Sequence, residues 1–449
     1  MKIAILGFGS EGKAVLKFLQ QRGQTRNKRG ITRNNNEIWI LDKNHNLRPP
    51  QGLQFQVGEN YLKNLADFDI VFRSPGIPYN LPEIQNAIKK GVKFSGATDL
   101  FFQNARKIGC KIIGITGTKG KGTISTLLYK ILRNAGKDVF LAGNIGKPAL
   151  DILAKLKKNS IVILEMSSFQ LQDLQHSPDI AVVLNVFEDH LDSHKNFKEY
   201  ISAKAQIAKF QKPNSKIFYD ASNKWSKWIA QKSPAQKFPI NPLFSNSAEL
   251  ENKVKSVVKI PGEHNLKNAV ITATVAKSLG IPENIILKTV KNYRGMEHRL
   301  ELVHSNILKN VGMNFFNDSA STNPYTAAAA IRAFPNQPKI LICGGKDKNL
   351  DYAPLAQALK NSKTKMVILF GENKKKINKA INNQKLAIRK VENLQQAVQL
   401  AYKTAKQLQQ LKQYNNTNII FSPAAASFDM FKDYKDRGEQ FKKIVKKLK

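Results

Sequence analysis

The sequence predicts an α/β protein of three domains built around mostly parallel sheets. Short apolar segments with the composition of buried strands alternate with helical patterns along almost the whole chain. Such alternation is typical of strand–helix–strand units. A chain of 449 residues leaves ample material for several domains, each with a core of its own. Changes in the pattern divide the chain into residues 1–106, 107–295 and 296–449.

The chain is strongly basic, with 72 Lys and Arg against 33 Asp and Glu and a formal net charge of +39. A charge of this size can indicate a nucleic-acid partner, an anionic membrane surface or highly phosphorylated substrates. The excess consists mostly of Lys spread along the chain, with abundant Asn beside it, as an AT-rich coding sequence would produce. We therefore favour composition bias and small anionic substrates, and we expect no nucleic-acid partner. A non-enzymatic nucleotide-binding protein with a basic surface stays an alternative.

Nothing in the sequence predicts secretion or a membrane span. The first apolar run, residues 3–6, is too short for a signal segment, and no apolar stretch approaches the ~18 residues of a membrane helix. Cys110 and Cys343 are the two cysteines, and both lie in apolar runs that we predict to be buried strands. So few cysteines argue against a disulfide scaffold. We expect a cytoplasmic protein.

The first block begins with a predicted strand at residues 2–6, followed by a glycine loop, Gly7 to Gly12, and a helix over about 13–21. The loop matches the G-x-G-x-x-G pattern, which brings backbone N–H groups close to phosphate at a helix N-terminus. Asp42 ends the next strand and could accept a hydrogen bond from a ribose. Between them, residues 24–36 look like a polar loop insertion. On these residues alone, a dinucleotide dehydrogenase or merely a tight turn is conceivable.

A second glycine-rich loop, Gly114 to Thr123, follows a predicted strand at 111–116 and opens a helix to about Ala135. Glycines free the backbone N–H groups to point at phosphates, and Lys121 adds positive charge at the β/γ position. Gly122 stands where a Ser or Thr usually binds magnesium, and the hydroxyl comes one residue later, at Thr123. This loop predicts nucleotide binding.

Carboxylates and a histidine follow the next strands of this block. Glu165 ends a strand at 160–164, and the end of a strand at 180–186 carries Asn185, Glu188, Asp189, His190 and Asp192. In a parallel sheet these ends lie beside the phosphate loop, where oxygen ligands can hold a hard cation. Lys204, judged by its own segment, is an exposed helix lysine. We therefore predict a magnesium site near Lys121.

The rest of the chain is less informative about chemistry. Residues 214–258 suggest strands and polar loops, and 262–279 a loop that enters a helix. The third block shows strands at 339–342, 366–370 and 418–421 and a polar helix over about 393–411. The Lys-rich stretch 374–390 fits a solvated helix face better than a nucleic-acid tract.

Taken together, these motifs resemble the Mur ligase family in content and in order. The segments that carry the resemblance are the phosphate loop, Gly143-Asn144-Ile145-Gly146, Glu165 to Gln170, Asn185 to Asp192, Gly262 to Asn268 and His298-Arg299. The resemblance implies a Rossmann-like N-terminal domain, a central P-loop ATPase domain with a mostly parallel sheet, and a Rossmann-like C-terminal domain. It also implies that the first glycine loop serves a UDP-sugar rather than a nicotinamide dinucleotide.

The activity that this resemblance implies is ATP-dependent amide ligation through an acyl phosphate. The acceptor would be UDP-N-acetylmuramoyl-L-alanine, the amino acid D-glutamate, and the setting cytoplasmic peptidoglycan precursor synthesis. ATP and two Mg²⁺ ions would be required, and the protein would be a monomer. The Asp-Asn-Pro-Arg signature of the diaminopimelate- or lysine-adding members is absent, which favours glutamate. L-glutamate is not excluded by the sequence.

The resemblance also assigns roles to individual residues. Those implied for catalysis are Lys121, Glu165, His190, Lys204 and Arg299. Those implied for ATP are Gly117, Thr118, Lys119, Gly120, Lys121, Gly122, Thr123, Asn265, Asn268, Arg299 and Asp318, with His264 nearby. The implied metal ligands are Thr123, Glu165, His190 and a carbamylated Lys204. Substrate contacts would come from Ser10, Glu11, Asp42, Ser74, Asn144 and Ser167, and from Thr322, Lys348, Ser427 and Tyr434 around the amino acid.

Three positions depart from the family pattern. Ala320 stands where a Lys is usual, Tyr434 replaces a common Phe, and Gly122 matches the phosphate loop of folylpolyglutamate synthase instead. That synthase is a relative that also adds glutamate, but it has no UDP-binding domain like residues 1–106. Folylpolyglutamate synthase chemistry is therefore a second alternative.

Overall fold

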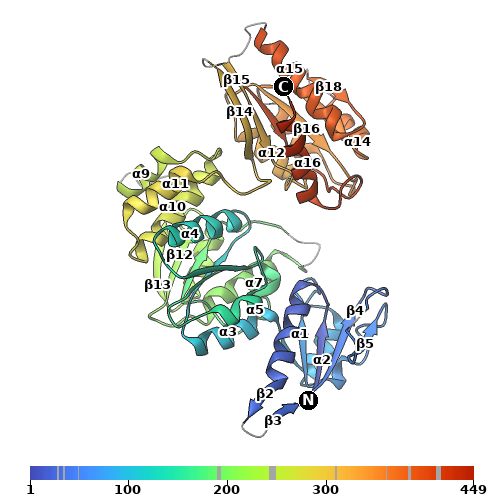
Figure 1. Cartoon of the computed structure of the whole chain (residues 1–449), viewed down its shortest axis with the longest axis vertical. Helices are drawn as coiled ribbons and strands as arrows, with labels where there is room; N and C mark the ends of the chain where they lie inside the picture. Colours follow the sequence, from blue (N-terminus) through green and yellow to red (C-terminus); the bar gives the residue numbers. More distant parts are fainter. Residues whose placement is uncertain are drawn as a thin grey trace. The chain divides into compact units, whose positions relative to one another are not determined.

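The structure is a computed structural model of the chain, and it describes residues 1–27, 30–33, 36–48, 50–189, 194–241, 249–308, 311–360, 362–382, 386–410 and 416–448. Three mostly parallel sheets flanked by helices follow one another along the sequence (Figure 1), which confirms the predicted α/β class. The chain divides into two compact units. The first comprises Met1–Val257 and Lys267–Val290, and the second comprises Val258–Leu266 and Lys291–Lys449. The predicted boundaries at 106/107 and 295/296 stay predictions.

The N-terminal sheet is parallel throughout, with the strand order β5-β4-β1-β6-β7. Its strands are β1 (Lys2–Leu6), β4 (Glu37–Asp42), β5 (Gln54–Val57), β6 (Ile70–Arg73) and β7 (Lys93–Ser95). Side chains alternate between two cores: Ile3 and Ile5 of β1 pack with α1 (Ser10–Gly23) and α3 (Ala97–Ile108), whereas Ala4 and Leu6 pack with α2 (Pro82–Lys89). This order places the carboxyl end of β1, with its glycine loop, at the point where the strand order reverses, which is where open α/β sheets bind ligands.

The prediction of a loop over residues 24–36 was wrong. After α1 the chain forms β2 (Gln24–Asn27) and β3 (Gly30–Arg33), which pair antiparallel as a separate two-stranded sheet. Such a ribbon is held by backbone hydrogen bonds and does not need the apolar runs by which strands were recognised. Its polar composition therefore hid it.

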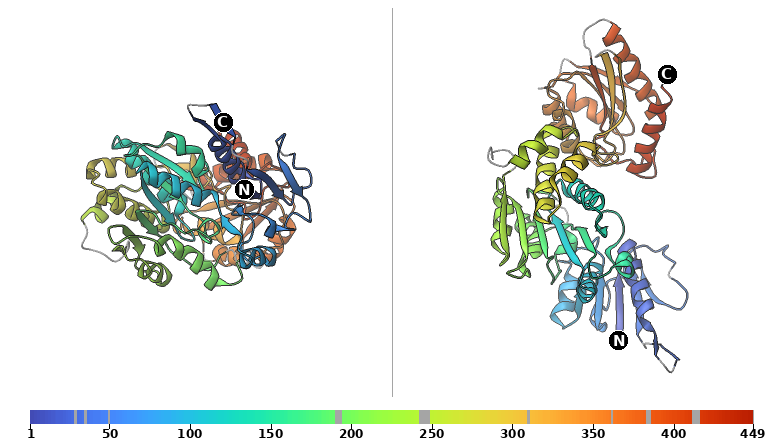
Figure 2. Two further views of the ribbon diagram at one scale, coloured as in Figure 1. Left: turned by 90° about the horizontal axis from the view of Figure 1, so that it is seen from below. Right: turned by 60° about the vertical axis from the view of Figure 1, so that its left-hand side comes forward.

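The central sheet has the order β13-β12-β11-β8-β10-β9, again all parallel. Its strands are β8 (Lys111–Thr116), β9 (Val139–Gly143), β10 (Ile161–Glu165), β11 (Ile180–Val183), β12 (Lys216–Asp220) and β13 (Gln236–Ile240). Its helices are α4 (Lys121–Asn134), α5 (Ala149–Ile152), α6 (Ser168–Leu171), α7 (Phe197–Lys209), α8 (Lys224–Gln231), α9 (Glu249–Val257), α10 (Glu263–Ser278) and α11 (Glu283–Asn292). Figure 2 gives two further views of these helices against the sheet. Because β8 lies between β10 and β11, its carboxyl end is a second reversal point.

The interval 214–258 contains more helix than we predicted. Between β12 and β13 the chain forms α8, and α9 follows before residue 258. Helix α8 is short, and α9 follows residues 242–248, which lie outside the described part of the chain. Helix α8 has 8 residues and α9 has 9, which is less than the roughly 10–12 residues over which periodicity separates a helix from a strand.

One continuous apolar core joins the first two sheets within the first unit. It runs from Ile3 and Ile5 through Phe101 and Phe102 of α3 to Leu150 of α5 and on to the central strands. A buried ion pair lies at the same boundary: Arg73, at the end of β6, is 2.9 Å from Asp173, and their side chains are 1% and 10% exposed. Arg73 also donates to the carbonyls of Ile77 and Phe169, at 2.6 and 3.1 Å. These contacts fix the turn after β6 against α6.

The C-terminal sheet has the order β14-β15-β19-β16-β17-β18, parallel except for the antiparallel pair of β14 and β15. Its strands are β14 (Glu301–Leu308), β15 (Val311–Asn317), β16 (Lys339–Gly344), β17 (Thr364–Phe370), β18 (Ala387–Lys390) and β19 (Asn416–Phe421). Helices α12 (Pro324–Arg332), α13 (Ala353–Lys360) and α14 (Lys374–Ile381) share a core with one face, and α15 (Leu394–Gln410) and α16 (Tyr434–Lys446) with the other. Asp318, Gly345 and Ser422 follow three neighbouring strands at one edge.

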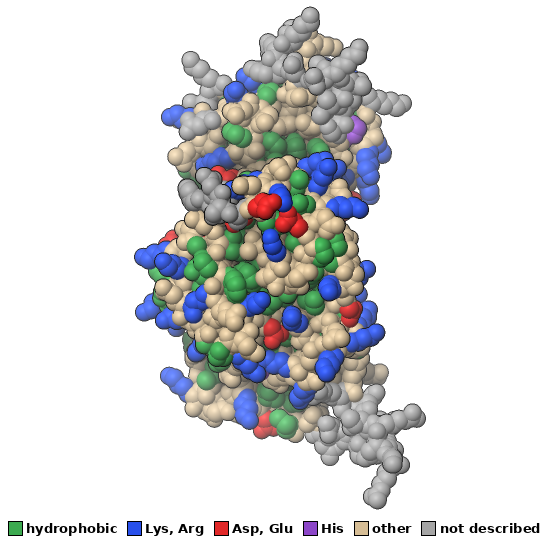
Figure 3. Space-filling model, turned by 90° about the vertical axis from the view of Figure 1, so that its left-hand side faces the viewer, with side chains coloured by type: hydrophobic (Ala, Val, Ile, Leu, Met, Phe, Trp, Pro, Cys, Tyr) green, Lys and Arg blue, Asp and Glu red, His purple; other side chains and the backbone are tan. Residues whose placement is uncertain are grey.

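The basic residues do not gather into a single patch on the face shown in Figure 3, where Lys and Arg side chains lie scattered between polar and apolar ones. Within the Lys-rich stretch 374–390, the described residues form α14 and the edge strand β18, and the buried residues of α14 are Ile377 and Ile381. Both cysteines are buried and free; Cys343 lies in β16 as predicted, whereas Cys110 directly precedes β8 and is not part of a strand. Among the described residues, no helix has both the length and the apolar character needed to cross a bilayer.

We expect Arg73→Met to lower the free energy of unfolding of the first unit by about 3 kcal/mol, because it leaves the buried Asp173 carboxylate without its partner. The double variant Arg73→Met/Asp173→Leu should recover most of this loss, since an apolar pair of similar volume replaces a buried ion pair at little cost. Urea unfolding followed by tryptophan fluorescence measures both, because Trp39, Trp225 and Trp228 all lie in this unit. An unchanged midpoint for the single variant contradicts the prediction.

Candidate active site

The phosphate loop of the sequence analysis forms between β8 and α4. Gly117 has φ +145° and Gly120 has φ +91°, which are backbone conformations that favour glycine. A side chain at Gly117 would also collide with Leu184, since a Cβ there would lie 2.6 Å from the Leu184 Cβ. Thr118 N donates to the carbonyl of Asn185 at 2.8 Å. The loop is therefore held against the chain that follows β11.

Two lysine amines converge on this loop. Lys121 Nζ donates to the carbonyl oxygens of Gly117 and Thr118, at 3.0 and 3.1 Å, and Lys204 Nζ donates to the same Gly117 oxygen at 3.0 Å. Burial, and then the charge of Lys121, hold the pKa of Lys204 well below its ordinary value. A second positive charge beside Lys121 is therefore disfavoured here unless an anion binds.

The interpretation of Lys204 as an exposed helix lysine was wrong, because only 1% of the residue is exposed. The buried residues of α7 are Tyr200, Ile201, Ala203, Lys204, Ile207 and Ala208. Lys204 thus continues the apolar stripe of its helix, four residues after Tyr200, and its amine lies 4.5 Å from the centroid of the Tyr200 ring. This periodicity was visible in the sequence and was the signal that could have revealed the buried lysine.

Glu165 lies at the carboxyl end of β10, between β8 and β9, and is 6% exposed. Its carboxylate accepts a hydrogen bond from Asn144 Nδ2 at 3.0 Å, and its main-chain oxygen accepts one from Asn144 N at 2.9 Å. Ser167 begins α6 as an N-cap and forms a capping box with Gln170. The structure thus brings Asn144 and Glu165 into contact at the sheet edge that carries the phosphate loop.

The residues present here suit a hard cation. Glu165 offers a buried carboxylate, and Asn185 Oδ1 is buried without a hydrogen-bond partner among the described residues. Thr123, in the first turn of α4, is 9% exposed and supplies a hydroxyl. Oxygen ligands of these kinds are the ones that magnesium prefers. His190 lies outside the described residues.

Other polar groups support the loop. Thr118 Oγ1 lies 3.0 Å from Tyr200 Oη, and burial raises the pKa of Tyr200 to about 12. Lys119 forms an ion pair with Asp189 at 3.0 Å, with the lysine side chain half exposed. A pair so open to solvent contributes little to stability. Asn268 of α10 packs against Gly120, where an added Cβ would lie 2.5 Å from its Oδ1.

In the N-terminal domain, Asp42 and Ser74 both hold the first glycine loop. Asp42 accepts hydrogen bonds from Phe8 N and Asn44 N, at 2.6 and 2.8 Å, and Ser74 Oγ donates to the Gly7 carbonyl at 2.6 Å. Glu11, beside the exposed Ser10, accepts from Gln170 Nε2 at 2.6 Å, and burial raises the pKa of Glu11. The substrate contacts implied for these residues stay predictions.

The second unit carries the remaining nucleotide candidates. Asn265 Nδ2 donates to the carbonyl of Pro261 at 2.7 Å, and Arg299 is exposed. Asp318 is 8% exposed, and its carboxylate accepts from Leu300 N at 3.2 Å and Ser422 Oγ at 2.7 Å. Burial raises the pKa of Asp318 to about 7. This buried carboxylate therefore links Leu300, before β14, to Ser422, after β19, at one edge of the sheet.

The amino-acid candidates lie at the same edge of the C-terminal sheet. Ser427 is buried, Thr322 is half-buried, and Lys348 and Tyr434 are exposed. Sequence reasoning missed Arg437, which is fully buried. Its guanidinium donates to the Ala425 and Ala426 carbonyls at 3.0 and 3.1 Å and to Ser319 Oγ at 3.0 Å. An arginine in a charged helix gives no local sign that it braces the segment before Ser427.

Comparison with known proteins agrees with this arrangement. Family models match three successive parts of the chain: the N-terminal domain of MurD-like Mur ligases over residues 1–96, the Mur ligase middle domain over 115–276, and the Mur ligase glutamate ligase domain over 298–411. The chain is also 32% identical to a UDP-N-acetylmuramoylalanine–D-glutamate ligase from Acetivibrio thermocellus, with 100% of this chain and 96% of the relative covered. The chain belongs to the Mur ligase family.

Solved structures share the fold of this Mur ligase. A UDP-N-acetylmuramate-alanine ligase, MurC, from Thermotoga maritima superposes with a TM-score of 0.57 at 16% identity over 100% of both chains. A folylpolyglutamate synthase from Mycobacterium tuberculosis gives a TM-score of 0.57 at 13% identity, but it covers 77% of this chain and 93% of its own. The predicted family and the three-domain α/β fold are thereby confirmed, and the roles of single residues stay predictions.

The buried Asp318 carboxyl predicts a stability that falls as pH rises. Its pKa is about 7 in the folded protein and ~3.9 when unfolded. Between these values the folded state binds more protons than the unfolded state, so the free energy of unfolding decreases with rising pH. Asp318→Asn removes this titration, and at pH 8 it should stabilise the sheet edge by ~2–4 kcal/mol.

Hydrogen exchange of the β15 and β19 amides between pH 5 and 8, corrected for the intrinsic exchange rate, measures this difference. The control is Asp347→Asn, at a half-exposed carboxylate of the same domain, which should follow the wild type at each pH. A wild-type protein and an Asp318→Asn variant with the same pH dependence would contradict the prediction.

Proposed function

We propose that this Mur ligase joins D-glutamate to UDP-N-acetylmuramoyl-L-alanine at the expense of ATP, as a step of peptidoglycan precursor synthesis. The observation that carries the proposal is the convergence of Lys121 and Lys204 on the Gly117 carbonyl, with Glu165 on the strand beside β8. The full-length relative that bears this activity in its name supports the choice of substrates.

The proposed reaction activates a carboxylate that is a poor electrophile at neutral pH. The acceptor carboxylate attacks the γ-phosphorus of ATP, which forms an acyl phosphate and releases ADP. The glutamate amine then attacks the acyl carbon, and the tetrahedral intermediate expels phosphate as the amide forms. Lys121 offsets negative charge on the γ-phosphoryl group while it is transferred. Arg299 is proposed to contact the nucleotide. The protein otherwise aligns the two reacting groups and excludes water.

For magnesium we propose Thr123, Glu165, His190 and a carbamylated Lys204 as ligands, with two ions as the expected number. Bound magnesium would neutralise phosphate charge. Carbamylation joins CO₂ to a neutral amine, and the lowered pKa of Lys204 favours that form. The carbamate would place an anionic oxygen ligand where the buried amine lies. Gly122 has no hydroxyl for a metal ion, but Thr123, the next residue in the first turn of α4, can supply one.

For the acceptor we propose contacts from Ser10, Glu11, Asp42, Ser74, Asn144 and Ser167. For the amino acid we propose Thr322, Lys348, Ser427 and Tyr434, where the Lys348 ammonium would meet the side-chain carboxylate. Residues 1–106 would then bind the UDP-sugar, 107–295 ATP, and 296–449 the amino acid. A cytoplasmic monomer without a nucleic-acid partner stays our expectation.

We expect ADP release beyond a single turnover only when UDP-N-acetylmuramoyl-L-alanine, Mg²⁺ and D-glutamate are all present. A coupled ADP assay across D-Glu, L-Glu, L-Ala and L-Lys measures this selectivity, and D-Glu should exceed the others at least about 100-fold in kcat/KM, because a misplaced carboxylate leaves buried polar groups unpaired. Turnover with a folate acceptor in place of the UDP substrate would instead favour folylpolyglutamate synthase chemistry. Salt-sensitive DNA binding without turnover would favour the non-enzymatic alternative.

Lys121→Ala should reduce kcat by at least about 100-fold, since it removes a cation aimed at the transferring phosphoryl group. The fold should persist, because the hydrogen bonds of the amine to Gly117 and Thr118 reach main-chain oxygens of its own loop and tie no other element to it. The matched control is Lys137→Ala, an exposed lysine shortly after the same helix. Circular dichroism and the ADP assay provide the two measurements, and a fully active Lys121→Ala enzyme would exclude the proposed mechanism.

A further inference from the structure

The segment His298-Arg299-Leu300 adopts an unusual backbone. His298 has φ +62° and Leu300 has φ +45°, so a left-handed residue stands on each side of Arg299. Residues other than glycine avoid this region because the Cβ crowds the backbone, and they stay there only where neighbours hold them. The conformation turns Arg299 outward, where it is exposed, while both neighbours are buried.

Main-chain hydrogen bonds hold both sides of Arg299. His298 N donates to Glu301 Oε2 at 2.9 Å, and the His298 carbonyl accepts from Ala320 N at 3.0 Å. On the other side, Leu300 N donates to Asp318 Oδ1 at 3.2 Å. The direction in which Arg299 leaves the domain is therefore set by groups at the ends of β14 and β15.

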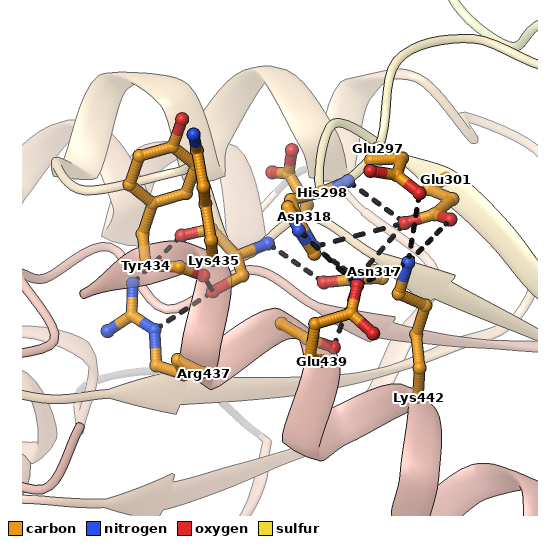
Figure 4. Close-up of polar contacts among 12 residues, drawn as sticks. Glu297, His298, Glu301, Asn317, Asp318, Tyr434, Lys435, Arg437, Glu439 and Lys442 are labelled. Carbon is orange, nitrogen blue, oxygen red and sulfur yellow. Dashed lines mark hydrogen bonds and ion pairs between the residues drawn. The ribbon is translucent and has the colours of Figure 1, made fainter. Parts of the chain in front are cut away.

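The imidazole of His298 adds a long-range anchor, and Figure 4 shows its partners. Its Nδ1 lies 2.9 Å from Asn317 Nδ2, and its ring meets the Tyr434 ring edge-on with centroids 6.2 Å apart. The ring rests directly on α16 at Gly438. A Cβ at Gly438 would lie 2.2 Å from His298 Nδ1, which no side chain can satisfy without movement.

Gly438 is otherwise out of place. It lies inside α16, where glycine is less favourable than alanine because it loses more backbone freedom. Its φ is not positive, so no turn or left-handed conformation requires it. The contact with the imidazole is the one feature of the described structure that excludes a side chain at this position.

The acidic groups around the ring do not form a cation site. Glu297, His298 and Glu439 offer ligand atoms within 4.8 Å of one another, but Lys442 Nζ already lies 3.5 Å from Glu297 and 2.7 Å from Glu439. Asn317 occupies the inner ring nitrogen. Lys442 supplies the positive charge that these carboxylates require, and burial with the charge of Lys442 lowers the pKa of the His298 ring.

We propose that Gly438 is a positioning residue for nucleotide use: by lacking a side chain it provides the seat on α16 for the His298 ring, and the seated ring fixes the direction of Arg299. This inference rests on the proposed function, in which Arg299 reaches ATP. It assigns a role in ATP affinity to a glycine that itself touches no substrate.

The test is a double-mutant cycle of Gly438→Ala and His298→Gly. Helix propensity alone predicts that Gly438→Ala raises the melting temperature. If the His298 ring occupies the space beside Gly438, the opposite is expected, and the midpoint of melting falls by several degrees. KM for ATP should then rise at least about fivefold, while KM for D-glutamate changes less than twofold. His298→Gly suits a positive φ and removes the ring, so in that background Gly438→Ala should raise the midpoint and leave KM for ATP unchanged.

Lys443→Ala, an exposed position of α16, is the control and should leave both KM values unchanged. A Gly438→Ala enzyme with a higher midpoint and wild-type KM for ATP would overturn the proposal, as would additive effects in the cycle or a rise confined to KM for D-glutamate. If Gly438→Ala alone does not fold, His298→Gly decides: its KM for ATP should rise at least about fivefold over the wild type because the ring that fixes Arg299 is gone, and a wild-type KM for ATP would overturn the proposal. Failure of the proposed function can be told apart from failure of this inference. In that case the wild type shows no glutamate-dependent ADP release, while the melting temperatures of the four proteins in the cycle still measure the contact between Gly438 and the His298 ring.

Discussion

The carbonyl oxygen of Gly117 is the acceptor on which the arrangement of the phosphate loop depends. Lys121 and Lys204 donate to it from two different helices, and Lys204 does so without water around its amine. Burial and the charge of Lys121 both lower the pKa of Lys204, so the loop disfavours a second positive charge beside Lys121. The balance changes when negative charge is added, either as phosphoryl oxygens or by modification of the lysine. The loop is thus arranged for the anionic state of its reaction rather than for its own greatest stability.

The sequence predicted the parts of this site that follow local rules. The glycine loop between β8 and α4 and the carboxylate that ends β10 were found because strand-end chemistry in a parallel sheet repeats along the chain. The burial of Lys204 was missed although the sequence places it on the same helix face as Tyr200 and Ile207. There the charge of the residue outweighed the periodicity of its helix. The strands β2 and β3 were missed because pairing of backbone groups leaves no compositional trace.

Other features could not have been predicted from local patterns, because each of them depends on a contact between residues more than a hundred positions apart. Arg437 braces Ser319 and the segment before Ser427, and Gly438 receives the ring of His298. In the sequence, this arginine and glycine lie in a helix crowded with charged residues and look like solvent-facing positions. The raised pKa of Asp318 likewise follows from its burial in the folded sheet, which outweighs the lowering effect of the hydrogen bonds from Ser422 and Leu300. Only the folded sheet brings these groups together.

The apolar core shared by the first two sheets limits how this protein can be recombined with others. Helices α3 and α5 are packed together within one cluster of buried side chains, and Arg73 ties the turn after β6 to α6. An exchange of the N-terminal segment alone would expose the faces of both helices and leave Asp173 without its partner. The smallest part of this protein that can be exchanged in a fusion or chimaera is therefore larger than the segment that a single family model covers. The module that can be inherited or transplanted intact is the pair of sheets with their common interior.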